Sequence, residues 1–295
     1  MVVSFATAVT AAALQPSCIR TRAARTVYMS LPDSIADPVV DALRRQGFGR
    51  VLSITDVSPL PGLSTRHVRY DTIEGPVFCK RCARPAAAAD AEAASLRVLR
   101  QAALAGGMLR VPEPLASGSL PLGGSFLLQE WLDPGFATLP SDSVLEQLGH
   151  GIAALHSAPQ PPPRRGFGFE CNTFLGTWQQ DNTWSRAVAD FFVRRRLEPL
   201  LNAVADSSSP ASKLGTEERR ALRRLTDPVL AAAEALLCVL ASPPALLHGD
   251  LRLENVRMTA DQQPVLHSPV HAGPADMAWG WVCFEGGSCA RNAEC

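Results

Sequence analysis

One short segment near the C-terminal end limits the possible fold more than any other feature. It reads His248-Gly249-Asp250-Leu251-Arg252-Leu253-Glu254-Asn255 and follows the apolar run 244–247. A tight loop after a buried strand can hold a carboxylate at an attacking hydroxyl and an amide oxygen on a metal ion, as phosphoryl transfer requires. We therefore predict that Asp250 is the catalytic group and Asn255 a metal ligand. The alternative is an ordinary turn with a capping aspartate.

A lysine and a glutamate upstream agree with this prediction. Lys80 ends a mostly apolar strand, and Glu92 follows on the next helix. In kinases a strand lysine holds the ATP phosphates and a helix glutamate holds that lysine. Alone, Lys80 would be read as an edge-strand lysine in solvent. Its combination with Asp250 favours an ATP site.

The order of the expected elements is that of a two-lobed, protein-kinase-like α+β fold. We expect a small antiparallel-sheet lobe at 33–132 and a mainly helical lobe at 133–295, with Glu130 and Leu132 in a linker that contacts the nucleotide. The apolar periodicity predicts helices at 33–46, 85–104, 141–156 and 217–240, and strands at 51–57, 66–72, 77–81 and 126–128.

A phosphate-binding loop is only weakly marked. Residues 61–65 lie between the first two expected strands but include one glycine, Gly62. Backbone amides and the hydroxyls of Ser64 and Thr65 would then have to hold the phosphates. A plain turn between strands explains this segment equally well.

Charge, hydropathy and cysteine spacing exclude several classes of protein. The 28 basic and 28 acidic residues cancel, so no global field draws the chain to nucleic acid or an anionic membrane. No run reaches the roughly 18 apolar residues of a membrane-spanning helix. The eight cysteines are scattered, unlike a compact secreted disulfide framework. Cys79 and Cys82 fall on opposite faces of a strand, which disfavours a metal or disulfide pair.

The first 32 residues have the composition of a targeting leader. They contain Arg20, Arg22 and Arg25 and no acidic residue before Asp33. We expect 1–32 to be an organellar transit peptide that directs the chain to the plastid, with the mitochondrion or the cytoplasm as alternatives. A secretory signal and a disordered Ala-rich tail are the other interpretations.

Further motifs point to one family. They lie at residues 75–80, 92–96, 166–169, 172–176, 182, 184, 191–192 and 196–197. Over roughly residues 40 to 275 the chain resembles the fructosamine kinase family, whose members are also called ketosamine-3-kinases or protein-ribulosamine 3-kinases. The 248–255 motif is shared with the wider kinase-like group that includes aminoglycoside and choline kinases, so it indicates the fold and not the substrate.

The resemblance implies an activity and a role for each site residue. A member would use ATP and Mg²⁺ to phosphorylate the third sugar hydroxyl of a ketoamine, on glycated protein or a small molecule, so that the adduct becomes unstable. By resemblance, Lys80 would hold ATP, Glu92 would hold Lys80, and Asp250 and Asn255 would keep the roles given above. Asn172, Thr173 and Trp184 are candidate contacts for the sugar, with packing as the alternative.

Two departures from the family pattern keep other hypotheses open. Where the family has a second metal-binding aspartate before a proline, this chain reads Leu266-His267-Ser268-Pro269, and serine offers magnesium no charge. The chain also ends about forty residues after Asn255, so we expect a shortened or altered C-terminal lobe. The alternatives are a nucleotide-binding pseudokinase or regulatory protein, and a small-molecule kinase of the aminoglycoside or choline type.

Overall fold

The computed structural model describes residues 37–58, 65–133, 142–159, 166–176, 178–206, 214–239, 244–251, 255–269 and 274–275. In these residues the helices and strands, in chain order, are α1 (Pro38–Arg45), β1 (Val51–Asp56), β2 (Thr65–Thr72), β3 (Gly75–Cys82), α2 (Ala86–Gly106), β4 (Pro114–Ser119), β5 (Ser125–Glu130), α3 (Asp142–His156), β6 (Thr173–Leu175), β7 (Trp178–Gln180), the π-helix η1 (Asp190–Leu197), α4 (Glu198–Ala205), α5 (Thr216–Cys238), β8 (Ala245–Leu246), β9 (Val256–Met258), β10 (Pro264–Leu266) and β11 (Pro274–Ala275).

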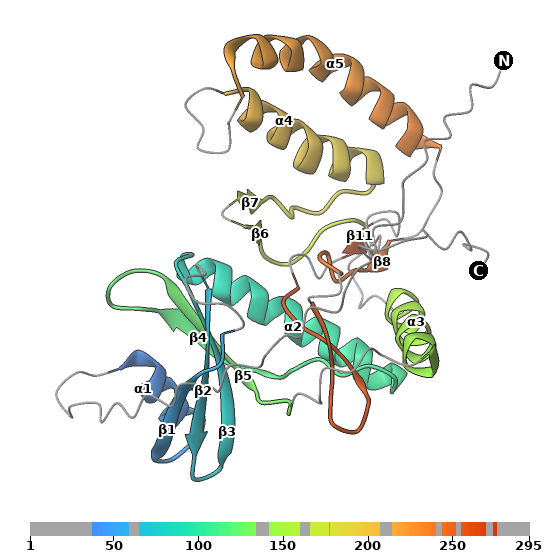
Figure 1. The fold of residues 1–295 in the computed structure, drawn as a ribbon. Coiled ribbons are helices and arrows are strands. Elements are labelled where there is room, and N and C mark those ends of the chain that lie inside the picture. The colour runs from blue at the N-terminus through green and yellow to red at the C-terminus, as the bar shows by residue number, and fades with distance from the viewer. Residues whose placement is uncertain are drawn as a thin grey trace, which may run out of the picture.

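The N-terminal lobe is built on an antiparallel sheet of five strands in the order β1-β2-β3-β5-β4 (Figure 1). Alternation along β2 buries Val68 and Tyr70, which pack with Leu43 of α1 and Leu128 of β5. The predicted three-strand meander and its first helix are confirmed. The sequence did not predict β4, because its residues are small and its pairing with β5 shifts register after Pro114.

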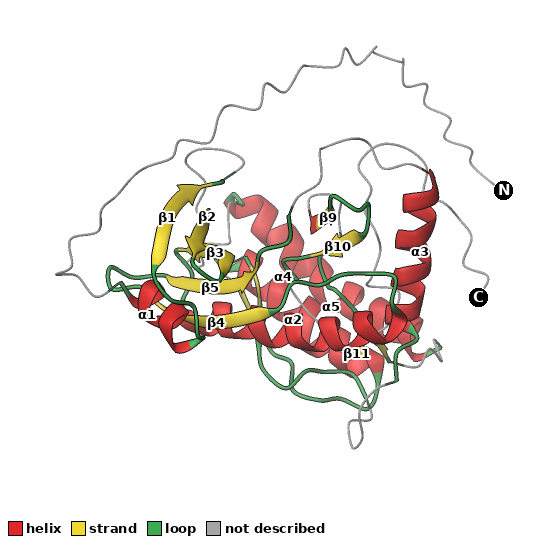
Figure 2. Ribbon diagram, turned by 90° about the horizontal axis from the view of Figure 1, so that it is seen from below, coloured by secondary structure: helices red, strands yellow, loops and turns green. Residues whose placement is uncertain are grey.

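Helix α2 belongs to the N-terminal lobe and packs against elements of both lobes. Its alanine-rich sequence runs for 21 residues and is capped by Gly107, whose φ of 69° is a left-handed conformation suited to glycine. Leu96 and Leu99 are fully buried and belong to a core with Leu127 of β5 and Leu148 of α3. Seen from below, α2 lies between the strands of the sheet and α3 (Figure 2). The site residues of both lobes are therefore anchored to one continuous core.

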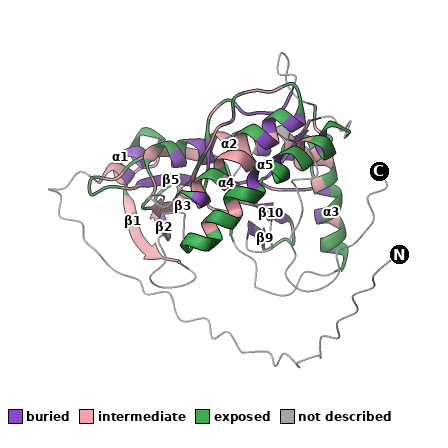
Figure 3. Ribbon diagram, turned by 90° about the horizontal axis from the view of Figure 1, so that it is seen from above, coloured by how far each residue is buried: buried purple, intermediate pink, exposed green. Residues whose placement is uncertain are grey.

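The C-terminal lobe has a second core around α4 and α5. Phe167 and Phe191 pack there with Leu230 of α5 and Leu247, the residue that follows β8. Pro228 lies inside α5, which still forms a single helix of 23 residues. Figure 3 shows exposed residues along much of α5, as expected for a helix at the edge of the lobe, whereas most residues of α4 are of intermediate burial.

The two-lobed α+β fold expected from the sequence is confirmed. Helices α3 and α5 lie where they were predicted, whereas η1, α4 and the short β6–β7 hairpin had not been predicted as elements. The expected transit peptide, together with Gly62 and Ser64, lies outside the described residues. No helix within the described residues is both long and apolar enough to span a bilayer.

Candidate active site

The loop after β8 places Asp250 and Asn255 in direct contact. The Asn255 Nδ2 donates to the main-chain oxygen of Asp250 and to its Oδ2, at 2.7 Å in each case. Gly249 has a φ of 80°, a conformation that glycine adopts without strain and that turns the chain sharply. Because both bonds use the amide nitrogen, Oδ1 is the amide atom of Asn255 that can bind a metal ion. The structure thus brings together the two residues predicted from the motif.

His248 fixes this loop to the segment that follows β10. The His248 Nε2 lies 3.0 Å from the carbonyl oxygen of His267, and the Asp250 backbone N–H donates to His248 Nδ1 at 3.4 Å. A carbonyl can only accept, so Nε2 carries the proton and Nδ1 accepts. Burial lowers the pKa of His248 to about 4, so the ring is neutral near pH 7. The sequence analysis gave His248 no role, although its place directly before Gly249 and Asp250 was a usable signal.

His248 predicts a pH dependence of stability. Its folded pKa of about 4 lies below the ordinary value of 6.5, so the unfolded chain binds the proton more tightly between these values. Lowering the pH from 7.5 to 5 should therefore reduce the free energy of unfolding by about 2 kcal/mol through this residue. Urea unfolding of His248→Gln should show a correspondingly smaller loss over the same range. Equal losses in both proteins would contradict the prediction.

Lys80 on β3 and Glu92 on α2 form a nearly buried ion pair. The Lys80 Nζ lies 2.8 and 2.9 Å from the two Glu92 carboxylate oxygens, and the side chains are 11% and 6% exposed. The Arg84 guanidinium lies 3.4 Å from the same carboxylate. The predicted lysine and glutamate pair is therefore present, and Glu92 is shared by two cations.

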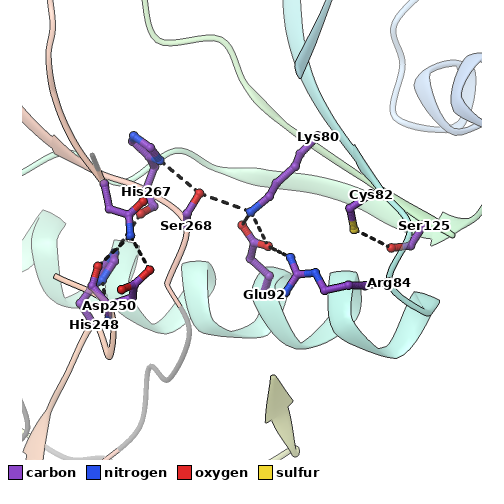
Figure 4. Close-up of polar contacts among 10 residues, drawn as sticks. Lys80, Cys82, Arg84, Glu92, Ser125, His248, Asp250, His267 and Ser268 are labelled. Atoms are coloured by element: carbon purple, nitrogen blue, oxygen red, sulfur yellow. Dashed lines mark hydrogen bonds and ion pairs between the residues drawn. The ribbon is translucent and has the colours of Figure 1, made fainter. Parts of the chain in front are cut away.

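Ser268 joins the ion pair to the catalytic loop (Figure 4). The Lys80 Nζ donates to Ser268 Oγ at 3.3 Å, and that oxygen lies 3.2 Å from His267 Nδ1. The main-chain N–H of His267 donates to the main-chain oxygen of Asn255 at 3.1 Å. The serine that departs from the family pattern thus occupies the junction between Lys80 of one lobe and the segment that bonds Asn255 in the other.

A cavity of about 300 Å³ lies against this junction. Its lining includes Phe78, Trp131, Leu132, Arg257, His267 and Ser268. One side is thus contributed by the sheet and the linker, and the other by β9 and the segment after β10. A mostly apolar cavity between the two lobes, with polar groups in its lining, suits a nucleotide.

Glu130 and Leu132 both line this cavity, as expected of the linker. The Glu130 carboxylate accepts hydrogen bonds from Arg100 at 3.0 Å and Arg110 at 2.9 Å. The main-chain N–H of Arg110 also donates to the main-chain oxygen of Pro264 at 2.8 Å. The Glu130 side chain therefore ties the linker to α2 and β10, and sequence reasoning missed both arginines because they lie far from it in sequence.

Of the predicted phosphate-binding loop, the structure describes Thr65. Thr65 is the first residue of β2 and pairs in the sheet with Cys82. Its partners in the prediction, Gly62 and Ser64, lie outside the described residues. Their contact with phosphate stays a prediction.

The candidate sugar-binding residues surround Asn182. The Asn182 N–H donates to Asn172 Oδ1 at 3.1 Å, and its Nδ2 donates to Thr173 Oγ1 at 2.9 Å. Arg196 also contacts the Asn182 side-chain oxygen. Thr173 is 1% exposed and in this conformation holds the loop together, as the packing alternative expects, and its contact with a sugar stays a prediction. Asn172 is exposed and Trp184 partly exposed, and their contact with a sugar stays a prediction.

The oxygen atoms beside Asp250 fit a magnesium ion, whereas the hydroxyl of Ser268 does not. Beside Asp250, the amide oxygen of Asn255 and a carboxylate are the hard oxygen donors that Mg²⁺ accepts. At Ser268 the donor is one neutral hydroxyl that already contacts the Lys80 ammonium. Within the described residues there is no group of three or more His, Cys, Asp or Glu side chains that could hold a metal ion.

The chain is similar in sequence to plant proteins with a named activity. The chain is 26% identical to a chloroplastic protein-ribulosamine 3-kinase of Arabidopsis thaliana, over 92% of this chain and 78% of the relative. It is 27% identical to the protein of the same name from Oryza sativa subsp. indica, over 92% of this chain and 74% of the relative.

Solved structures show the same fold. A Haemophilus somnus 129PT protein that carries the name fructosamine-3-kinase has a TM-score of 0.63 and 21% identity, over 81% of this chain and 72% of that one. An aminoglycoside phosphotransferase solved with AMP-PNP and hygromycin B has a TM-score of 0.53 and 17% identity, over 82% of this chain and 74% of that one. The family model for fructosamine kinase matches residues 39–276, and the chain belongs to the fructosamine kinase family.

Proposed function

We propose that this protein uses ATP to phosphorylate the sugar 3-hydroxyl of ketoamines, the ribulosamine or fructosamine adducts of protein lysines, and so starts deglycation. The observation that carries the proposal is that Ser268, which lines the cavity, contacts Lys80 of the Lys80–Glu92 pair. The adjacent His267 bonds the main chain of Asn255, which contacts Asp250. Membership of the family, and the name shared by the plant relatives, support this substrate class.

In this mechanism the Asp250 carboxylate orients the substrate hydroxyl and accepts its proton as the oxygen attacks the γ-phosphorus of ATP. The new bond joins the sugar oxygen to that phosphorus, and the bond from phosphorus to the bridging oxygen of ADP breaks. Lys80 donates hydrogen bonds to the phosphates, and Glu92 keeps its ammonium in position.

Asn255 Oδ1, with Asp250 beside it, would hold a magnesium ion. Bound there, the ion would supply positive charge to the transferring phosphoryl group. Asp250 accepts a hydrogen bond from the Asn255 amide, which fixes its carboxylate where it can meet both the hydroxyl and this ligand.

The plastid is the compartment we propose for this activity. The plant relatives carry the word chloroplastic in their names. The composition of residues 1–32 supports the same destination. Import of the full chain into isolated chloroplasts, with removal of the leader followed by gel mobility, would test it against import into mitochondria.

The activity is tested by phosphate transfer from magnesium ATP by the full chain. We expect product with a ribulosyl-lysine or fructosyl-lysine peptide, and at least tenfold less with free aminoglycosides or choline. Mass spectrometry of the peptide locates the added phosphate. Faster transfer to an aminoglycoside or to choline would replace the proposed substrate class with the small-molecule alternative.

A pseudokinase is the second candidate, and Ser268 is the observation in its favour. A neutral hydroxyl in contact with Lys80 holds magnesium poorly. Binding of ATP with no transfer to any of these substrates would support this candidate.

A further inference from the structure

We propose that side-chain cations take the place of a divalent ion at the Ser268 end of the cavity, so that ATP binds without magnesium although transfer requires it. This inference rests on the proposed function, because it concerns how the same site holds the nucleotide phosphates. The groups involved are Lys80, Ser268, His267 and Arg257.

The first argument is the charge balance next to Ser268. Lys80 and Arg84 share the single carboxylate of Glu92, so two positive charges and one negative charge leave a net +1. Arg257 adds a further cation on the cavity wall. A polyphosphate that enters this cavity meets positive charge before any metal ion is added.

The second argument is where the carboxylates are. Among the described residues that line the cavity, the carboxylates are those of Glu130 and Asp133, both from the linker. The Glu130 carboxylate is already bound by two arginines. Asp250 contacts Asn255, on the far side of the 267–268 segment from Lys80. The Ser268 end therefore has nitrogen donors and a hydroxyl, which suit a phosphate oxygen and not a metal ion.

The third argument is the position of the Ser268 hydroxyl. Its Oγ lies 3.3 Å from the Lys80 Nζ and 3.2 Å from the His267 Nδ1, and Arg257 lines the same cavity as Ser268 and His267. The two cations come from separate elements, Lys80 from β3 and Arg257 from β9. Donors from both lobes are thus available to a phosphate oxygen at this end of the cavity.

Ser268 also allows a matched pair of test variants. Its φ of 57° is in the left-handed region, where aspartate and asparagine are tolerated better than most residues. Ser268→Asp therefore adds a negative charge, and Ser268→Asn adds a side chain of nearly the same size without charge. Arg257 is exposed, so Arg257→Gln should fold normally.

The experiment measures ATP binding by calorimetry, with magnesium and with EDTA. We expect the Kd of the parent and of Ser268→Asn to differ by less than about threefold between the two buffers. Ser268→Asp should bind ATP about tenfold more weakly in EDTA than in magnesium, because its carboxylate repels the phosphates unless a cation lies between them. Arg257→Gln should weaken ATP binding about threefold or more in both buffers.

Three results would overturn the inference. A parent Kd that rises tenfold or more in EDTA would show that a metal ion, and not the side chains, holds the phosphates, while the proposed kinase function would stand. The same follows if Ser268→Asp and Ser268→Asn respond alike. If the parent binds no ATP in either buffer and transfers no phosphate, the proposed function fails together with the inference.

Discussion

Replacing Asp250 with asparagine is expected to slow phosphate transfer by about 10²–10⁴-fold, because an amide cannot accept the proton of the attacking hydroxyl. The fold should be unchanged, since the asparagine oxygen can still accept the hydrogen bond that Asn255 donates at 2.7 Å. The Kd for ATP should also stay within a few-fold, because Lys80 and Glu92 are untouched. Single-turnover transfer and nucleotide binding, measured on the same preparation, separate these effects.

Asp227→Asn provides the matched control for this variant. Asp227 is exposed on α5, in the outer part of the C-terminal lobe, so Asp227→Asn is the same chemical change at a different place in the fold. Its transfer rate should equal that of the parent. Transfer by Asp250→Asn at more than about a tenth of the parent rate would remove Asp250 from the catalytic role, whatever the control shows.

The sequence predicted those parts of the site that are set by short spacing. Asp250 and Asn255 share one loop, so their separation along the chain almost determines their contact. Lys80 and Glu92 belong to a strand and the helix that follows it, so they also meet through local chain geometry. In both cases the residue types and the order of elements were enough to predict the pairing.

Other parts of the site depend on segments that are far apart in sequence. The bond between His248 and the His267 carbonyl requires the catalytic loop to pack beside the end of β10. The bonds from Arg100 and Arg110 to Glu130 require α2 and the segment after it to lie beside the linker. Periodicity indicates that a helix or strand is present but not which distant residue it contacts, so these contacts could not be predicted.

The loop around Asn182 shows a different limit. The motifs at 172–176, 182 and 184 were part of the resemblance to the family, and that resemblance made Thr173 a candidate sugar contact, with packing as the alternative. In the structure the Thr173 hydroxyl lies 2.9 Å from the Asn182 amide and is buried. A motif can thus be typical of a family because it builds the loop, so membership does not show which of its residues touch the substrate.

Glu92 is the residue whose loss should destabilise the fold most among those at the site. Its side chain is 6% exposed and balances both Lys80 and Arg84. Glu92→Gln should reduce the free energy of unfolding by about 3–5 kcal/mol, since the nearly buried Lys80 and the partly buried Arg84 would both lose this carboxylate. Lys80→Met should cost less than about 2 kcal/mol, because Glu92 would keep Arg84 as its partner. Urea unfolding of both variants measures this asymmetry.

Glu113→Gln is the control for the loss of a carboxylate from an ion pair. Glu113 pairs with Arg100 at 3.1 Å, but its side chain is 55% exposed, so its removal should change stability by no more than about 1 kcal/mol. The two site variants should also differ in function, because Lys80→Met removes the ammonium that we propose contacts phosphate, whereas Glu92→Gln only loosens that ammonium. Equal destabilisation by Glu92→Gln and Lys80→Met would mean that Arg84 does not share the carboxylate. The network would then be a simple pair, and the positive charge next to Ser268 would be smaller than the contacts imply.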